Sequence, residues 1–273
     1  MKQSEKQKKI ALSGAIGFEN FYASLFGLRW QALKAALEQE PPLCRLDAGG
    51  EKPYFLDAAS IFCANMLPLA GAKNILDMCA APGGKMLVLA LRMENDALLC
   101  ANEKSAARKL RLQNTSKNCL PLSVQNRIEI HCADSAKLGS TKNKAQFQKY
   151  DAILLDAPCS SERHLLLNDK KYIESWSPAR IRTVNREQWA LIQSGFALLK
   201  NGGFLLYATC ALGESENDAI IEKLLAAHPD ALCIETPRQN VAIETAIDTA
   251  IDTAAILRPE KTPDYGKYTG YIL

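Results

Sequence analysis

The chain has 273 residues, of which 48% are hydrophobic and 23% are charged, and its formal net charge is +3. This is the composition of an ordinary soluble protein with enough apolar residues for one large domain or two small ones. We expect no membrane-spanning segment, because the longest uncharged stretch, residues 58–72, contains Asn65 and Pro68.

Two helical segments are predicted near the start of the chain. Apolar residues recur at helical spacing between Phe18 and Leu37, and Pro41-Pro42 closes this segment. A second helix is predicted around residues 62–69. We predict a small helical N-terminal extension over residues 1–52, followed by one domain over residues 53–273.

Short apolar runs then alternate with helix-like stretches. The runs lie at residues 74–78, 97–102, 127–131, 152–156 and 203–209. Helices are predicted over residues 181–199, where Asn201-Gly202-Gly203 ends the helix before the next strand, and over residues 217–228. Such alternation is typical of a parallel sheet with helices on both faces. The last run, residues 268–273, is predicted to be an edge strand.

Residues 242–253 contain three near copies of the pattern Ala-Ile-acid-Thr. On a helix, the isoleucines would form a narrow apolar stripe. We interpret this repeat as a short sequence expansion in a peripheral helix and not as a functional motif.

A glycine-bearing loop follows the first strand of the alternating region, in the run Asp77-Met78-Cys79-Ala80-Ala81-Pro82-Gly83-Gly84-Lys85. Glycines let a ligand approach the backbone, and the first amides of the next helix point outward. Glu103 ends the next apolar run, placed to accept hydrogen bonds from ribose hydroxyls, and Asp134 is placed to receive an adenine amino group. The pattern predicts a nucleoside-containing cofactor. Its spacing does not separate NAD from S-adenosylmethionine, although the lack of GxGxxG disfavours a dinucleotide.

Two later strands are each followed by a cysteine, in Asp156-Ala157-Pro158-Cys159 and in Ala208-Thr209-Cys210. Strand ends of this kind are where open α/β sheets do chemistry, so the chain is predicted to be an enzyme with two thiols at its centre. Position alone does not choose the nucleophile. Inert packing is the alternative for each thiol, and it is our expectation for Cys44, Cys63, Cys100, Cys119, Cys132 and Cys233.

The nine cysteines indicate a reducing compartment. They cannot all pair, and none forms a CxxC motif or a His/Cys cluster. Residues 1–9 are polar and rich in lysine, without the apolar segment of a signal peptide. We therefore expect a cytoplasmic protein with no metal site.

Basic residues are unevenly distributed. No acid occurs in residues 104–127 or 137–149, which carry Lys104, Arg108, Lys109, Arg111, Lys117, Arg127, Lys137, Lys142, Lys144 and Lys149. One face is therefore predicted to attract a polyanion. The alternative interpretation is a set of solvated surface charges.

The run from Asp77 to Lys85 resembles the cofactor motif of the Sun-domain RNA cytosine-5 methyltransferases. Asp156-Ala157-Pro158-Cys159-Ser160 and Thr209-Cys210 resemble that family's other two signatures, in the family's order and spacing. Residues 54–60 are similar to the motif that precedes the family's domain. Further positions that fit the family pattern are Gln188, Gly202, Gly203, Glu216 and Asn217.

One segment departs from the usual family pattern. Most members follow the Pro-Cys-Ser motif with a Gly-x-Gly-like turn, whereas this chain has Ser161-Glu162-Arg163-His164. Together with residues 22–30, this departure resembles the branch of mitochondrial ribosomal-RNA and transfer-RNA enzymes.

The resemblance implies a Rossmann-like class I methyltransferase fold, with a mostly parallel seven-stranded sheet and helices on both faces. It also implies S-adenosylmethionine as the cofactor. The residues expected to bind it are Cys79, Ala80, Ala81, Pro82, Gly83, Gly84, Lys85, Glu103, Arg108, Asp134 and Asp156.

Carbon 5 of cytosine is a poor nucleophile, so its methylation requires a thiolate that adds to carbon 6. The resemblance implies that Cys210 is this nucleophile and that Cys159 assists breakdown of the covalent intermediate. Asp156 is expected to hydrogen-bond the cytosine ring nitrogen and amino group. Lys85 is expected to lower the pKa of the thiol or to hold the base.

The expected substrate is ribosomal or transfer RNA with an unpaired or flipped-out cytosine. Site selection is left to the N-terminal extension, to residues 160–176 or to a partner protein. Two alternatives stay open: a DNA cytosine-5 methyltransferase with Cys159 as nucleophile, and a non-catalytic RNA-binding ribosome-assembly factor. Both cysteines, Lys85 and Asp156 argue against the second, because a pure binder has no chemical need for them.

Overall fold

The computed structural model describes residues 13–139, 149–168, 170–234 and 271–272. The repeat predicted at residues 242–253 lies outside this range. The chain divides into two compact units, each made of three segments. Unit 1 consists of Met1–Pro41, Pro158–Trp189 and Thr209–Ile220, and unit 2 consists of Pro42–Ala157, Ala190–Ala208 and Ile221–Leu273.

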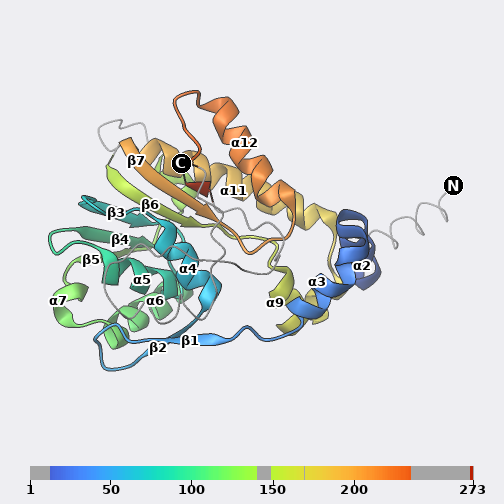
Figure 1. Cartoon of the computed structure of the whole chain (residues 1–273), viewed down its shortest axis with the longest axis horizontal. Coiled ribbons are helices and arrows are strands. Elements are labelled where there is room, and N and C mark those ends of the chain that lie inside the picture. The colour runs from blue at the N-terminus through green and yellow to red at the C-terminus, as the bar shows by residue number, and fades with distance from the viewer. Residues whose placement is uncertain (1–12, 140–148, 169, 235–270, 273) are drawn as a thin grey trace, which may run out of the picture. The chain divides into compact units, whose positions relative to one another are not determined.

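Unit 2 contains a six-stranded sheet with the strand order β5-β4-β3-β6-β7-β8 (Figure 1). Its strands are β3 (Asn74–Asp77), β4 (Leu98–Asn102), β5 (Ile128–His131), β6 (Tyr150–Asp156), β7 (Leu199–Ala208) and β8 (Tyr271–Ile272). The first five are parallel and β8 is antiparallel to β7. The predicted α/β class, the five parallel strands and the edge strand are therefore confirmed, and the structure adds that the edge strand is antiparallel.

The central strands are buried on both faces, as expected of a parallel sheet covered by helices. Residues 152–155 of β6 and both Ile75 and Leu76 of β3 are fully buried. The helices α4 (Ala58–Met66), α5 (Gly84–Arg92) and α6 (Ala106–Cys119) supply side chains to the same hydrophobic core. Shorter helices follow at α7 (Leu122–Gln125) and α8 (Ser135–Leu138), and the later helices are α11 (Pro178–Leu198) and α12 (Asp218–Ala227).

The implied seven strands are one too many for the part of the sheet that the structure describes. The additional strands β1 (Leu43–Leu46) and β2 (Tyr54–Asp57) pair with each other in a separate antiparallel ladder and do not join the sheet. Helix α11 ends at Leu198, close to its predicted end, but the next strand begins earlier than expected, because Gly202-Gly203 lies inside β7. Leu199 pairs with Tyr150 and Phe204 with Ala152, so the intervening residues form an irregularity in the strand.

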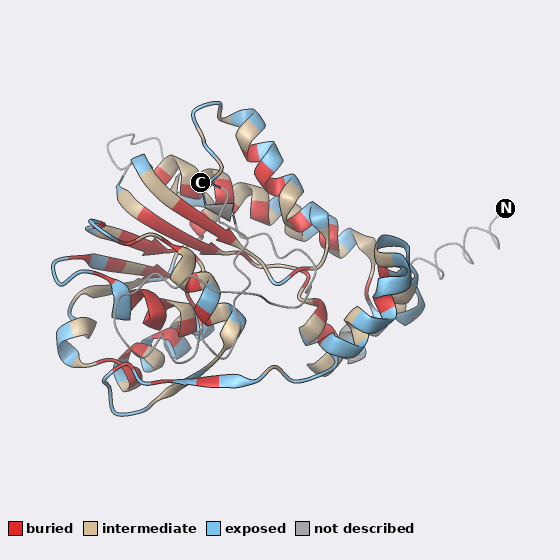
Figure 2. Cartoon of the chain, viewed as in Figure 1, coloured by how far each residue is buried: buried red, intermediate tan, exposed pale blue. Residues whose placement is uncertain are grey.

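Unit 1 is built around an aromatic core. Its N-terminal helices are α2 (Gly14–Phe26) and α3 (Trp30–Leu37), separated by a 3₁₀ turn at Gly27, whose φ is 55°. The single helical segment predicted over residues 18–37 is thus broken by a glycine. Buried Phe18, Tyr22 and Trp30 pack together with Trp176, a residue far along the chain. In Figure 2 part of α2 is coloured as buried.

Unit 1 also contains α9 (Glu162–Asn168), α10 (Lys170–Glu174) and the 3₁₀ turn η3 (Glu214–Glu216). Leu165 of α9 and Ile181 of α11 complete the aromatic core. The segments that follow the two sequence-predicted thiols therefore fold with the N-terminal helices. Among the described helices, none combines the length and the apolarity needed to cross a bilayer.

Candidate active site

A cavity of about 240 Å³ lies in unit 2 beside the loop that follows β3. Its lining residues are Tyr54, Leu56, Asp57, Ser60, Asp77, Cys79, Ala80, Ala81, Pro82, Gly84, Lys85 and Asp156. The sequence-predicted cofactor loop is therefore one wall of a real cavity. Gly83 is not part of the lining, but it is the residue that precedes α5.

Neighbouring side chains pack closely against the glycines of this loop. A Cβ atom on Gly84 would lie 2.7 Å from a methyl group of Leu56, and one on Gly83 would lie 2.9 Å from a methyl group of Thr115. Gly83 also has a φ of 120°, which disfavours any residue with a side chain. The loop can therefore approach β2 and α6 closely, and Gly84 and Lys85, the first residues of α5, line the cavity.

Lys85 and Asp156 form an ion pair in this cavity. Lys85 Nζ donates to Asp156 Oδ2 at 2.7 Å and to Ser60 Oγ at 3.2 Å. Burial lowers the pKa of Lys85, but the charge and hydrogen bond of Asp156 outweigh it, so the pKa lies above its ordinary value. Lys85 therefore remains a cation at neutral pH and holds the Asp156 carboxyl in place.

Asp77 is a functional candidate that the sequence analysis placed in the loop motif without assigning it a role. It is 1% exposed, and neither carboxyl oxygen has a hydrogen-bond donor of good geometry. Burial, together with the charge of Asp156, raises the pKa of Asp77 from 3.8 to about 7. A buried carboxyl of this kind is an acceptor that lacks a donor.

Three other predicted cofactor residues lie at the ends of the neighbouring strands. Glu103 follows β4 and is buried, and its Oε2 lies 3.5 Å from Arg108 Nη1 without a hydrogen-bond donor. Arg108 Nη2 donates to the carbonyl of Ala81 at 2.6 Å, so it braces the loop. Asp134 begins α8 as its N-cap, and its carboxylate lies 3.6 Å from Lys104 Nζ.

These residues fit S-adenosylmethionine, the cofactor that the sequence motif implies. Asp77 and Glu103 end adjacent parallel strands, since Asp77 pairs with Ala101 of β4. Each has a buried carboxyl oxygen in need of a donor. The ammonium and ribose hydroxyl groups of a nucleoside amino acid supply such donors. Cys79 also lines the cavity, and its thiol stays neutral because burial and then Asp77 raise its pKa.

The two thiols meet in unit 1. Cys159 Sγ and Cys210 Sγ are 2.9 Å apart although 51 positions separate the residues in sequence. Neither forms a disulfide, and Cys210 is the more exposed residue of the two. The hydrogen bond to Cys210, reinforced by burial, raises the pKa of the Cys159 thiol. Cys159 therefore keeps its proton in this pair and is able to donate it to the sulfur of Cys210.

Two buried carboxyl groups tie the thiol-bearing segments together. Glu162 accepts hydrogen bonds from the hydroxyls of Tyr22 and Ser160 and from the N–H of Leu212. Glu216 Oε2 accepts from the N–H of Ser160 at 2.9 Å and from Gln188 Nε2 at 3.0 Å. Because Ser160 follows Cys159 and Leu212 lies two residues after Cys210, these bonds fix both segments within unit 1.

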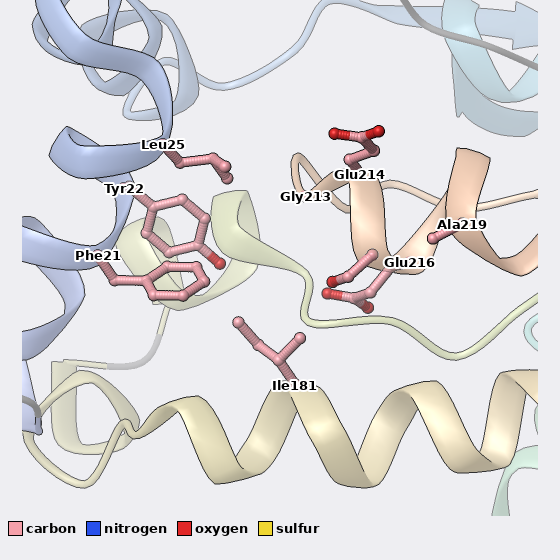
Figure 3. A pocket seen from close by; sticks show the side chains of 9 residues that line it. Phe21, Tyr22, Leu25, Ile181, Gly213, Glu214, Glu216 and Ala219 are labelled. Carbon is pink, nitrogen blue, oxygen red and sulfur yellow. The ribbon is translucent and has the colours of Figure 1, made fainter.

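A second cavity, of about 350 Å³, lies in unit 1 (Figure 3). Phe21, Tyr22 and Leu25 of α2 line it, facing Ile181 and the acidic segment at Glu214–Glu216. None of the described lining residues is a cation, so this cavity offers no counter-charge to a phosphate. It differs in this respect from the cavity of unit 2, which contains Lys85.

The structure thus brings the predicted catalytic residues together in two pairs, one in each unit. Lys85 contacts Asp156, and Cys159 contacts Cys210. Sequence reasoning missed Ser60 and Ser161, each of which contacts one of these pairs. Ser60 lies in the segment similar to a family motif, whereas the only signal at Ser161 was its departure from the usual glycine-rich turn.

The sequence of this chain matches a protein family and several characterised relatives. The family model described as 16S rRNA methyltransferase RsmB/F matches residues 64–265. The 5-cytosine rRNA methyltransferase NSUN4 of Xenopus tropicalis is 34% identical over 188 residues, which cover 67% of this chain and 45% of that protein. The mitochondrial tRNA (cytosine(34)-C(5))-methyltransferase of Danio rerio is 33% identical over 189 residues, covering 69% and 50%. The chain therefore spans half or less of the length of these relatives.

Solved structures support the fold. A methyltransferase homologue from Pyrococcus horikoshii has a TM-score of 0.62 at 22% identity and covers 84% of each chain. NSun6 from the same organism, solved with SFG, has a TM-score of 0.53 at 26% identity and covers 70% of this chain and 46% of that one. The Rossmann-like methyltransferase fold expected from the sequence is confirmed.

Proposed function

Because the chain belongs to the RsmB/F family of methyltransferases, we propose that it methylates carbon 5 of a cytosine in RNA with S-adenosylmethionine as the methyl donor. The observation that carries the proposal is the contact between two thiols, Cys159 and Cys210, each from one of the family's signature motifs. A pair of thiols at this distance suits a reaction in which one sulfur bonds the substrate and the other assists.

The cavity of unit 2 is the proposed cofactor site. S-adenosylmethionine supplies an electrophilic methyl group when bound. Glu103 would accept hydrogen bonds from the ribose hydroxyls and Asp77 from the ammonium group, beside Gly84 and Lys85 at the start of α5. Support for this assignment comes from NSun6 of Pyrococcus horikoshii, which was solved with SFG, an analogue of S-adenosylmethionine.

Cys210 is the proposed nucleophile. It is the more exposed residue of the pair, and the raised pKa of Cys159 leaves that thiol as a hydrogen-bond donor to the Cys210 thiolate. Attack of Cys210 on carbon 6 makes carbon 5 nucleophilic enough to accept a methyl group. A base from solvent then takes the carbon 5 proton, the electrons of that C–H bond restore the ring double bond, and the bond between carbon 6 and Cys210 breaks. The Cys159 thiol assists by donating a hydrogen bond to the departing thiolate.

Lys85 and Asp156 are proposed to act on the base as a pair. Asp156 hydrogen-bonds the cytosine ring nitrogen and amino group, which favours addition of the thiolate. Lys85, which keeps its charge, fixes the orientation of the Asp156 carboxyl through the 2.7 Å contact. The target cytosine is unpaired or flipped out, because a stacked base cannot present its face to a thiol and a methyl donor together.

The substrate class is ribosomal or transfer RNA, the two classes named for the relatives. The acid-free helix α6 carries Lys109, Arg111 and Lys117, and these are proposed to hold RNA phosphates. A partner protein is proposed as one route to site selection.

The cysteines, none of which is in a disulfide among the described residues, suit a reducing compartment. We propose the cytoplasm, and cell fractionation would reveal the alternative, the mitochondrial matrix.

The roles of the two thiols are tested with labelled RNA, S-adenosylmethionine and denaturing gels. Cys210→Ala is expected to lose both methylation and covalent adduct, whereas Cys159→Ala is expected to accumulate protein bound to RNA. Cys132→Ala is the matched control, because Cys132 is an exposed free cysteine outside the pair. Equal loss of adduct in both active-site variants would contradict the assigned roles, and loss confined to Cys159→Ala would make Cys159 the nucleophile. Bisulfite sequencing of RNA from cells without the protein would then identify the cytosine.

A further inference from the structure

Ser161 has an unusual backbone conformation. Across the residues that the structure describes, it is the only one other than glycine with a positive φ, at 55°. The left-handed region is unfavourable for a residue with a Cβ atom, and glycine adopts it without this cost. Strain at a single position persists only where the surroundings enforce it.

The neighbours of Ser161 do enforce it. Ser160 and Glu162, on either side, are 0% and 1% exposed. Ser160 is held through its N–H by Glu216 and through its hydroxyl by Glu162. The carbonyl of Ser161 accepts from the N–H of Leu165 at 3.1 Å, in the first turn of α9. Ser161 is therefore fixed on both sides, and its side chain has little freedom to move away.

The side chain of Ser161 lies against both sulfurs. Its Oγ is 3.3 Å from Cys159 Sγ and 3.6 Å from Cys210 Sγ, and it is also 3.3 Å from the carbonyl oxygen of Cys159. The three atoms form a closed triangle with the 2.9 Å contact between the sulfurs. Glycine would relieve the backbone strain at this position but has no hydroxyl. Serine accepts the strain and places a hydroxyl beside both sulfurs.

We propose that Ser161 is a further residue of the reactive centre, whose hydroxyl donates a hydrogen bond to the thiolate of Cys210 and so favours loss of the Cys210 proton. This inference rests on the proposed function in one respect, the choice of Cys210 as nucleophile. While Cys210 is a thiol, its S–H donates to Ser161 Oγ. After the proton leaves, the hydroxyl rotates and becomes the donor. Hydrogen bonds to a charged acceptor are stronger than those to a neutral one, so the thiolate gains more than the thiol.

Other ionisable groups of unit 1 also influence this titration. Cys159 contacts Cys210 directly, and the buried carboxyl groups of Glu162 and Glu216 lie on the segments that hold the two thiols. Tyr22 contacts Glu162, and burial raises the pKa of its hydroxyl, so it stays neutral. All four groups are retained when Ser161 alone is changed, so their contributions are common to the proteins compared.

The test is the pH dependence of iodoacetamide alkylation, with Cys210 and Cys159 followed as separate peptides by mass spectrometry. Ser161→Ala and Ser161→Gly are both expected to raise the alkylation midpoint of Cys210 by about one pH unit, a tenfold change in the thiolate equilibrium. Ser161→Gly, which also relieves the strain, is expected to unfold at a higher temperature than Ser161→Ala. Ser24→Ala is the control, because the Ser24 hydroxyl donates to the carbonyl of Phe21 and touches neither sulfur.

An unchanged Cys210 midpoint in both Ser161 variants would overturn the inference. A raised midpoint in Ser161→Ala with a normal one in Ser161→Gly would also overturn it, because the effect would then come from the backbone. The assay needs neither RNA nor S-adenosylmethionine. Failure of the wild-type protein to methylate RNA would refute the proposed function, and methylation that survives Cys210→Ala would refute Cys210 as the nucleophile. The alkylation midpoints judge the role of Ser161 by themselves.

Discussion

Replacing Asp77 by Asn is expected to stabilise the protein at neutral and alkaline pH. The carboxyl of Asp77 is buried at the end of β3 and has no hydrogen-bond donor of good geometry. Burial, with the nearby charge of Asp156, raises its pKa from 3.8 to about 7. Asn has a similar size and cannot ionise, so it removes the cost of a buried charge.

The sign and size of the effect follow from the two pKa values. Between about pH 4 and pH 7 the folded protein keeps a proton on Asp77 that the unfolded chain has lost, so the free energy of unfolding falls as the pH rises through this window. The two pKa values differ by about three pH units, and each unit corresponds to about 1.4 kcal/mol. The variant is therefore expected to match the wild type near pH 4 and to exceed it by up to about 4 kcal/mol near pH 8.

The assay is urea unfolding of both proteins across this pH range. Asp96→Asn is the control, because Asp96 is exposed and its bond to Lys73 lowers its pKa, so its loss brings no gain at alkaline pH. A difference between Asp77→Asn and wild type that does not change with pH would refute the reasoning, as would a variant less stable than wild type near pH 8. The gain in stability is expected to accompany weaker binding of S-adenosylmethionine, measured by calorimetry, because the amide lacks the charge.

Three further outcomes are expected. Hydrogen peroxide should join Cys159 and Cys210 in a disulfide, with peroxide reduced to water, because their sulfurs are 2.9 Å apart. Differential alkylation and mass spectrometry detect the disulfide. Two thiols that stay reduced after peroxide treatment would contradict the proximity of the sulfurs. Trp30→Ala should lower the free energy of unfolding by about 3–5 kcal/mol, since the side chain is fully buried in the aromatic core; a loss below about 1 kcal/mol in urea unfolding would argue against that packing. A double variant, Arg111→Glu with Lys117→Glu, should bind RNA more weakly than the wild type. The slope of log affinity against log salt should fall by about 0.7 for each phosphate that the variant no longer neutralises. An unchanged slope would exclude α6 from the RNA-binding face.

The sequence by itself determined the alternation of strands and helices. Apolar runs at residues 74–78, 97–102, 127–131 and 152–156 became the parallel strands β3, β4, β5 and β6 within one or two residues. Most of these runs are short and largely apolar because both faces of the central parallel strands are covered, so the signal is local in the chain. The motif between Asp77 and Lys85 likewise placed a cavity wall correctly, since the loop and its glycines are contiguous residues.

Only the tertiary structure decided which distant side chains meet. The sulfurs of Cys159 and Cys210 come into contact across 51 positions, and Tyr22 bonds Glu162 across 140. No periodicity encodes such contacts, because they depend on how separate segments pack around a shared core. For the same reason the sequence did not show that α2 and α3 share an aromatic core with Trp176. The missing donor at Asp77 likewise became visible only in the folded structure.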